Sequence, residues 1–271
     1  MPIDVDLQVP NLVGRTVPRP SGTLSGHAAG LPFEHLVHGN LLAAYPNQCR
    51  RHYEMVNEIL LAHPKATTYE ERAALFGPEA LQQLVMRGKQ PTIGWSPENL
   101  FEEKQNDTAE SIVLEKPQFD LRGNHVTLVD VKTRNNSISG QPPNIMSAGK
   151  LAEAMRASLQ AGKVAFDIVY VGITFEPTDT TLVCREIRTV SLFKIEHALY
   201  INWAAAEQIQ FHVSDADQDF DGTREQWAHK FLSTFCQSLD ERIQKQNKRL
   251  QKYQAVLSQQ PPTAPSTPPS P

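Results

Sequence analysis

The sequence predicts a mixed α/β fold. A chain of 271 residues is about what one large α/β or α+β domain uses. With 40% hydrophobic and 21% charged residues it can bury a substantial core, which excludes a wholly disordered chain. Apolar residues follow helical spacing towards both ends of the chain and form short strand-like runs in the middle. We therefore expect a central sheet flanked by helices.

The N-terminal third predicts an irregular segment followed by helices. Residues 1–32 are rich in Pro, Gly, Ser and Thr, so we expect them to be irregular. Apolar residues at 33–37 and again at 53–60 recur at helical spacing and indicate two helices. A third helix is expected over residues 79–86, because Pro78 stands where a first-turn proline is favoured.

The middle of the chain predicts strands. Residues 111–114 and 126–132 are β-prone runs separated by turn residues, which indicates an antiparallel pair. The polar run NNSISGQPP (135–143) predicts a loop, and apolar residues at helical spacing from Ile145 to Met155 predict a helix after it. Further strands are expected at 166–175 and 181–188.

The C-terminal part predicts one long amphipathic helix after Thr223. Its distal half is basic, and that basic face is interpreted either as a solvated surface or as a patch for phosphates; its residues are Arg242, Lys245, Lys248, Arg249 and Lys252. The proline-rich stretch 259–271 cannot bury apolar surface and is expected to be a disordered tail. We therefore expect a single domain over residues 1–258.

Charge and cysteine content limit the kind of protein. The 26 Lys and Arg against 30 Asp and Glu give a net charge of -4, which argues against binding a polyanion through bulk charge. The three cysteines show no C-x-x-C spacing, which favours a reducing compartment. Neither a secretory signal nor an uninterrupted apolar span is visible, so a cytoplasmic protein without membrane contact is expected.

The most informative run is LVDVKTRN at 128–135. Residues two apart share one face of a strand, so Asp130 and Lys132 are expected to project together. A carboxylate that holds Mg²⁺ beside an ammonium that orients or deprotonates water suits phosphodiester cleavage. The tripeptide is short, and a surface ion pair is the alternative interpretation. A nuclease site needs a second carboxylate from the neighbouring strand, and Glu110 is placed to supply it, with Asp107 as the alternative.

Longer stretches strengthen the nuclease hypothesis. The chain resembles the HincII family of type II restriction endonucleases in five blocks that occur in the same order, namely SGTLSGHAAG (21–30), SPENLFEEKQNDTAE (96–110), VDVKTRN (129–135), LYINWAAAEQIQFHV (199–213) and GTREQWA (222–228). The resemblance covers about residues 15–230. It implies a restriction-endonuclease-like PD-(D/E)xK fold similar to that of EcoRV.

The resemblance also implies roles for the catalytic residues. Asp130 and Lys132 match the family's second metal-binding aspartate and its catalytic lysine, and the carbonyl of Val131 would be a further metal ligand. The family's first carboxylate is an aspartate, whereas this chain has Glu110 at the matching position. One additional methylene moves the carboxylate, so slower turnover or an altered metal preference is expected.

Further residues are expected to contact DNA. Gln141 matches a glutamine that inserts into the base stack, although its neighbours Gly140 and Pro142 depart from the family pattern. Asn144 and Asn202 match base-contacting asparagines; without the resemblance, a turn-forming role would be the simpler interpretation of each. Weaker candidates for DNA contact are Gln105 and Lys89.

Together these features predict a Mg²⁺-dependent type II restriction endonuclease, with Mn²⁺ as a possible substitute. The resemblance implies a homodimer that cuts double-stranded GTYRAC at its centre to give blunt ends with 5′-phosphates, in the prokaryotic cytoplasm. A companion DNA methyltransferase would protect the host. Two alternatives remain open: a repair or junction nuclease on the same fold, and a DNA-binding relative whose catalysis is weakened at Glu110.

Overall fold

The computed structural model describes residues 7, 9–22, 26–85, 95–102, 109–116, 121–196 and 199–258. Of the side chains of Gly26 and His27 nothing is described. The chain divides into two compact units, residues 1–232 and 233–271. The proline-rich tail at 259–271 and the end of the predicted helix at Met86 lie outside the described residues.

The first unit is built on a six-stranded mixed sheet. Its strand order is β1-β7-β6-β4-β3-β2. The central pair β4 and β6 is parallel, and the other neighbours are antiparallel. The strands are β1 (Thr16–Pro18), β2 (Cys49–Arg51), β3 (Ser111–Leu114), β4 (Val126–Asn135), β6 (Phe166–Pro177) and β7 (Thr181–Ser191). The predicted pairing of 111–114 with 126–132 is confirmed, and the strands predicted at 166–175 and 181–188 are present.

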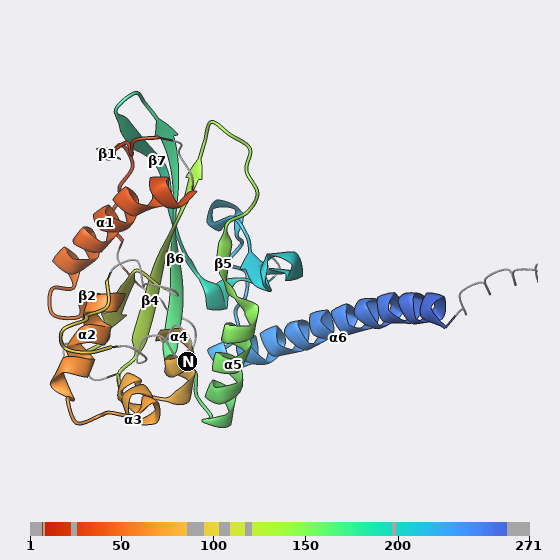
Figure 1. Ribbon diagram of the computed structural model, residues 1–271. Coiled ribbons are helices and arrows are strands. Elements are labelled where there is room, and N and C mark those ends of the chain that lie inside the picture. Colours follow the sequence, from red (N-terminus) through yellow and green to blue (C-terminus); the bar gives the residue numbers. More distant parts are fainter. Residues whose placement is uncertain are drawn as a thin grey trace, which may run out of the picture. The chain divides into compact units, whose positions relative to one another are not determined.

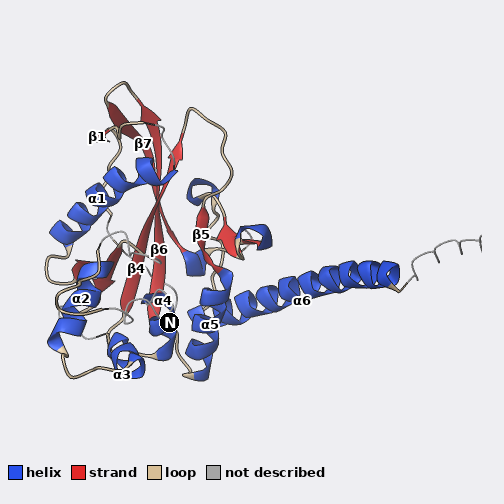
Figure 2. Ribbon diagram, viewed as in Figure 1, coloured by secondary structure: helices blue, strands red, loops and turns tan. Residues whose placement is uncertain are grey.

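A smaller sheet of three strands stands beside the main one. Its order is β5 (Asn144–Ser147), β9 (Gln208–Gln210), β8 (Tyr200–Asn202), with both pairings antiparallel. Three short 3-10 turns lie around these strands: η3 (Leu192–Lys194) precedes β8, η4 (Trp203–Ala205) joins β8 to β9, and η5 (Val213–Asp215) follows β9. Figure 2 shows the long strands β4, β6 and β7 crossing the first unit, with β5 to one side of them.

Helices cover both faces of the main sheet. In Figure 1, α1 and α2 lie on one side of β4 and β6, whereas α5 lies on the other. The parallel pair β4 and β6 needs a crossover connection, and α5 lies in the segment that supplies it. The helices are α1 (Gly26–Ala44), α2 (His52–Ala62), α3 (Tyr69–Ala73), η1 (Ala74–Phe76), α4 (Glu79–Val85), α5 (Ala148–Gln160) and α6 (Arg224–Leu257).

Helix α1 begins earlier than the sequence predicts. Residues 1–32 were expected to be irregular, but α1 starts at Gly26 and contains Pro32. Phe33, Val37 and Leu41 recur at helical spacing and are buried against the sheet. The Phe33 ring lies 5.7 Å from that of Phe175 on β6. Burial of this apolar face outweighs the missing N–H of the proline, so the helix extends through a segment of turn-prone composition.

The helix predicted from Ile145 to Met155 begins later than expected. Ile145 and Met146 belong to strand β5, and Ser147 is the N-cap of α5, accepting a hydrogen bond from the Lys150 N–H at 3.3 Å. Pairing with β9, about 60 residues further along the chain, holds these residues extended. Local apolar spacing therefore gave the wrong start for this helix.

No helix in the described ranges is long and apolar enough to cross a membrane. The three cysteines are free, and Cys236 on α6 is the exposed one.

A buried anion ties three distant segments of the first unit together. Asp167 on β6 is 2% exposed and accepts hydrogen bonds from the Arg224 guanidinium at 2.7 and 2.8 Å. The His125 ring lies 2.6 Å from the same carboxylate. Burial alone would raise the pKa of Asp167, but its hydrogen bonds to His125 and Arg224 outweigh burial and hold the pKa below its ordinary value.

Replacing the arginine should destabilise the fold. We expect Arg224→Met to lower the free energy of unfolding by about 3 kcal/mol at neutral pH, because it removes one partner of a buried ion pair. Urea denaturation measures the change. The stability that the ionised Asp167 contributes is fully present above the pKa of an aspartate in the unfolded chain. It is lost as the pH falls through the lower pKa of Asp167 in the folded protein. Asp167→Asn should therefore show a shallower loss of stability in acid, and an unchanged acid slope would contradict this assignment.

Candidate active site

Strands β3 and β4 place the predicted catalytic residues side by side. Glu110 immediately precedes β3, and its N–H donates to the Val129 carbonyl at 3.1 Å, so it continues the β3–β4 ladder. Asp130 and Lys132 lie two residues apart on β4, as the strand period predicts. The structure thus brings Glu110 and Asp130 together from adjacent strands.

Two short contacts fix the geometry of this cluster. The Glu110 carboxylate accepts a hydrogen bond from the Val131 N–H at 2.8 Å. The Lys132 ammonium lies 2.8 Å from the Asp130 carboxylate, and the Asp130 side chain is 4% exposed. The Lys132 side chain is 22% exposed, so the pair is largely buried at its carboxylate and reaches solvent at its lysine, which argues against a fully exposed surface ion pair as the alternative for Asp-x-Lys.

Burial and like charge perturb the titration of this cluster. Burial raises the pKa of Glu110 well above its ordinary value, and the adjacent Asp130 carboxylate raises it further. Burial would lower the pKa of Lys132, but the carboxylates of Asp130 and Glu110 outweigh burial and hold that pKa above its ordinary value. When both carboxylates are ionised, one ammonium does not balance their charge. A largely buried site of this kind therefore favours the binding of a cation.

The residues of the cluster fit a small divalent cation. Carboxylate and carbonyl oxygens are the ligands of Mg²⁺, which commonly takes one or two carboxylates and keeps several waters. Glu110 and Asp130 supply two such carboxylates, and the raised pKa of Glu110 reflects a repulsion that a cation between them would relieve. In the described part of the chain, no group of three or more His, Cys, Asp or Glu side chains could form an all-side-chain metal site.

Two residues that the sequence did not indicate border the cluster. Tyr170 is fully buried on β6, directly opposite Asp130 in the parallel register, and its hydroxyl lies 3.4 Å from the Met146 sulfur. Burial, and then the charges of Asp130 and Glu110, raise the pKa of Tyr170 well above its ordinary value. The carboxylate of Glu34 on α1 acts on both Glu110 and Lys132. Both residues reach the site through tertiary packing, which no local motif reveals.

The predicted intercalating residues stand on an exposed loop. Gly140 and Gln141 are exposed and Pro142 is partly exposed, in the segment between β4 and β5. Lys89, Gln105 and Asp107 lie outside the described residues. Glu110 is therefore the described carboxylate beside Asp130.

The two predicted base-reading asparagines are linked through a glutamine. Gln210 on β9 donates to the Asn144 side-chain oxygen at 2.7 Å and accepts from the Asn202 side-chain nitrogen at 2.9 Å. The Asn202 oxygen also accepts from the N–H groups of Ala204 and Ala205, so it caps η4 as well. The local turn role considered for a lone asparagine is thus present at Asn202. Gln210 lies in the stretch LYINWAAAEQIQFHV, but only the structure shows that it joins the two asparagines.

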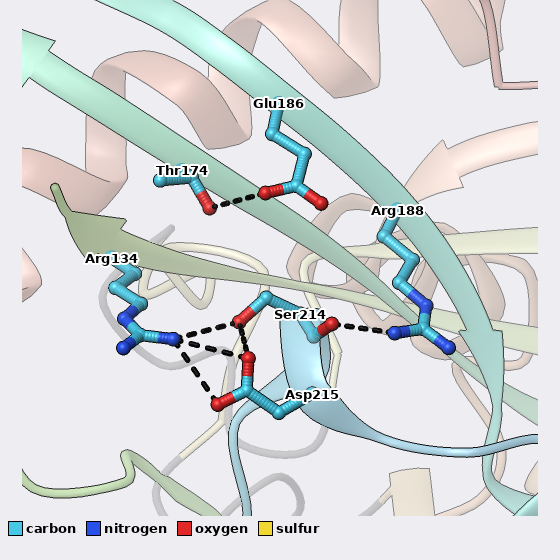
Figure 3. Close-up of polar contacts among 6 residues, drawn as sticks. All are labelled: Arg134, Thr174, Glu186, Arg188, Ser214 and Asp215. Carbon is cyan, nitrogen blue, oxygen red and sulfur yellow. Dashed lines mark hydrogen bonds and ion pairs between the residues drawn. The ribbon is translucent and has the colours of Figure 1, made fainter.

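A second polar cluster anchors η5 to the main sheet next to Lys132. Figure 3 shows Arg134 pointing to Ser214 and Asp215, while Arg188 on β7 donates to the Ser214 carbonyl. The Arg134 nitrogen lies 3.1 Å from both the Ser214 hydroxyl and the Asp215 carboxylate. A small pocket beside this cluster is lined in part by Lys132, Arg134 and Ser214. The contacts fix one wall of the space next to the catalytic lysine candidate.

Close packing of η5 also depends on a glycine. Gly172 pairs with Lys132 in the β4–β6 register, and a Cβ added there would lie 2.7 Å from a methyl carbon of Val213. Any side chain at position 172 would push η5 away from the sheet. The glycine therefore sets the distance between η5 and the strand that carries the site.

A mixed sheet with two carboxylates and a lysine at neighbouring positions is typical of nucleases of the PD-(D/E)xK class. The model of the family described as restriction endonuclease HincII matches residues 9–254. The chain is 47% identical over 234 residues to the type II restriction enzyme HindII of Haemophilus influenzae (strain ATCC 51907 / DSM 11121 / KW20 / Rd), covering 85% of this chain and 88% of that relative. It has the same identity and coverage with the type II restriction enzyme HincII of Haemophilus influenzae.

The chain belongs to the HincII family of type II restriction endonucleases. The predictions of the fold class and of a site-specific deoxyribonuclease are therefore confirmed. Enzymes of this type act on DNA and use a divalent metal.

The glycine at 172 gives a test of the packing beside the site. We expect Gly172→Ala to lower the free energy of unfolding by about 1–3 kcal/mol, because the new methyl overlaps Val213. Gly39→Ala on α1 is the matched control: nothing lies within 4 Å of its added Cβ, and alanine is the better helix former. The control should be neutral or stabilising in urea denaturation. Equal effects of the two substitutions would contradict the packing argument.

Proposed function

We propose that this protein is a Mg²⁺-dependent homodimer that cuts double-stranded DNA at GTYRAC and leaves blunt ends with 5′-phosphates. The observation that supports this most directly is the placement of Glu110, Asp130 and Lys132 together on β3 and β4. This arrangement supplies what phosphodiester hydrolysis needs: oxygen ligands for a cation and a fixed ammonium at the reacting phosphate.

Each residue of the cluster has a distinct role in this proposal. Glu110, Asp130 and the Val131 carbonyl would hold Mg²⁺, which supplies Lewis-acid stabilisation of charge on the phosphate oxygens. Mn²⁺ would substitute because it accepts the same oxygen ligands. The Val131 N–H donates a hydrogen bond to one Glu110 oxygen and fixes its position. The position of the other oxygen depends on the torsion angles of the side chain. The hydrogen bond from Val131 and the adjacent Asp130 carboxyl orient the longer glutamate.

Lys132 would orient the attacking water and offset the negative charge of the phosphorane. Its ammonium lies 2.8 Å from the Asp130 carboxylate, and this ion pair holds the ammonium in one position. Water would attack in line with the leaving 3′-oxygen, and the product ends would be a 5′-phosphate and a 3′-hydroxyl. Arg134 and the Ser214–Asp215 turn confine the far side of Lys132.

The proposed DNA contacts lie on the loop after β4 and on the small sheet. Gln141, flanked by Gly140 and Pro142, would enter the base stack, where a flexible pyrimidine-purine step lowers the deformation energy. Asn144 and Asn202 would read base edges, with Gln210 holding their amide groups in register. Lys89 and Gln105 belong to the proposed DNA contacts on resemblance alone.

The biological setting follows from this activity. A palindrome presents two equivalent strands, and two identical active sites related by a two-fold axis match that symmetry. We propose a single catalytic domain over residues 1–258, a prokaryotic cytoplasmic location, and a companion DNA methyltransferase that protects host DNA from cleavage.

Digestion of a sequenced plasmid tests the activity. In Mg²⁺ we expect blunt fragments whose ends all fall at GTYRAC, read by end sequencing. Lys132→Ala should remove cleavage and keep specific DNA binding in Ca²⁺. Blunt ends at another palindrome would overturn the recognition sequence but not the chemistry. Binding without cleavage in both Mg²⁺ and Mn²⁺ would instead favour the DNA-binding alternative, and cutting of branched DNA without a unique linear site would favour the repair alternative.

The glutamate at 110 gives a second test. We expect Glu110→Asp to raise the single-turnover cleavage rate in Mg²⁺ by about tenfold, because a shift of about 1 Å in a ligand is costly for near-attack geometry. The ratio of the Mn²⁺ rate to the Mg²⁺ rate should fall at the same time. Glu110→Gln is the matched control that keeps the length but removes the charge, and it should be inactive. An unchanged or lower rate of Glu110→Asp in both metals would contradict the prediction.

A further inference from the structure

Helix α6 carries an apolar seam that extends far beyond its buried first turns. Among its described side chains, the buried ones are Trp227, Ala228 and Phe231. From Cys236 onward, mostly apolar residues recur at alternating steps of three and four over three heptads. They are Cys236, Leu239, Ile243, Gln246, Leu250, Tyr253 and Leu257. These are the a and d positions of a coiled coil, with Cys236 at a and Leu239 at d.

The apolar members of this seam are exposed in the second unit taken by itself. Leu239, Ile243, Leu250, Tyr253 and Leu257 are between 36% and 84% exposed. The basic residues Lys245, Lys248 and Lys252 fall at positions c, f and c, away from the seam. The helix is therefore apolar along one narrow stripe and basic on the opposite face. A stripe with a period of 3.5 residues suits a partner helix that winds along it, whereas packing on a globular surface needs a wider apolar face.

We propose that the seam from Cys236 to Leu257 pairs with the same seam of a second copy of this chain as a parallel two-stranded coiled coil. The seam covers 22 residues of α6, which gives a contact of about 33 Å at 1.5 Å per residue. A coiled coil of this length is short. Its affinity is raised most where two chains are already held near one another, because the effective concentration of the partner helix is then high.

The charges beside the seam select a parallel orientation. In a parallel pair, position g of one helix faces position e of the next heptad on the other, so Arg242 faces Asn247 and Arg249 faces Gln254. A fully overlapped antiparallel pair would place Arg242 opposite Arg249 twice, and like charges there are repulsive. The polar side chain of Gln246, at a d position, favours the register in which the Gln246 side chains of the two helices face each other.

Cys236 makes the proposal directly testable. Cys49 and Cys184 are buried, whereas Cys236 is exposed at an a position. In a parallel, in-register pair, equivalent a positions face each other, so two Cys236 thiols come within reach of a disulfide. The full chain is treated with diamide and resolved by non-reducing electrophoresis. We expect a covalent dimer that is absent in Cys236→Ser.

Three cysteines introduced into the Cys236→Ser background define the orientation. Tyr253→Cys at a d position near the far end should form the dimer, and Ser238→Cys at position c should not. Gln246→Cys lies near the midpoint of the seam and would cross-link in either orientation. A dimer from Gln246→Cys, without one from Cys236 or Tyr253→Cys, would overturn the parallel proposal. Equal cross-linking of Ser238→Cys and Cys236 would show random collision and overturn the pairing itself.

A charge on the seam provides an independent readout. Leu250→Glu should slow formation of the Cys236 disulfide about tenfold, which corresponds to a loss of one decade in pairing affinity. Lys245→Glu, at position c, is the matched control and should leave the rate unchanged. Equal rates in both variants would overturn the proposal. The assay contains no DNA or metal, so its failure is distinguishable from failure of the proposed nuclease.

Discussion

The candidate active site depends on two carboxylates and a lysine that the sheet holds side by side, with the carboxylates buried. Such a cluster is costly, because each charge loses hydration and the two carboxylates repel one another. The ion pair between Lys132 and Asp130 offsets part of this cost, and a backbone N–H holds Glu110. The residual strain appears in the raised pKa of Glu110. A rigid, doubly covered sheet is what keeps these groups together, since a looser structure would let them separate and hydrate.

The surrounding packing is arranged to preserve this rigidity. The central pair β4 and β6 is buried between α1 on one face and the small sheet with α5 on the other. Tyr170 fills the position opposite Asp130 with an aromatic ring in edge contact with Phe211. Gly172, two residues further along β6, lets η5 approach the sheet, where Arg134 and Arg188 bind η5. On β6 the bulky Tyr170 and the small Gly172 therefore each set the distance of a different neighbour.

The sequence predicted the parts of the fold that rest on local signals. Strands β3 and β4 were placed correctly because β-prone residues run between clear turn signals, and the period of two put Asp130 and Lys132 on one face. The early start of α1 and the strand β5 were missed. In both cases distant partners, Phe175 for α1 and β9 for β5, outweigh local composition or spacing.

The candidate site was predictable to a similar extent. Glu110 could be placed because it directly precedes a predicted strand and lies in a stretch resembling the family. Tyr170, Glu34 and Gln210 could not, since each reaches its neighbours through the fold; Gln210 lies in a stretch resembling the family, but nothing in that stretch indicates its contact with Asn144. For Asn202 the structure shows the local turn role, and the same amide also contacts Gln210, whereas its role as a base reader stays a prediction.

The buried Asp167 has a consequence for how the first unit opens. Asp167 itself lies on β6, and its two partners are His125, which precedes β4, and Arg224, the first residue of α6. Separating Asp167 from these partners would leave a buried carboxylate without its hydrogen bonds, which is costly, so the contacts oppose separation of the three segments. The start of α6 is thereby tied to β6, and Trp227 and Phe231 in its first turns are buried as well, whereas the helix beyond Phe231 continues for about seven turns with no buried side chain. Fluctuations of that length therefore meet the packed side chains of Phe231 and Trp227 before they meet the ion pair at Arg224.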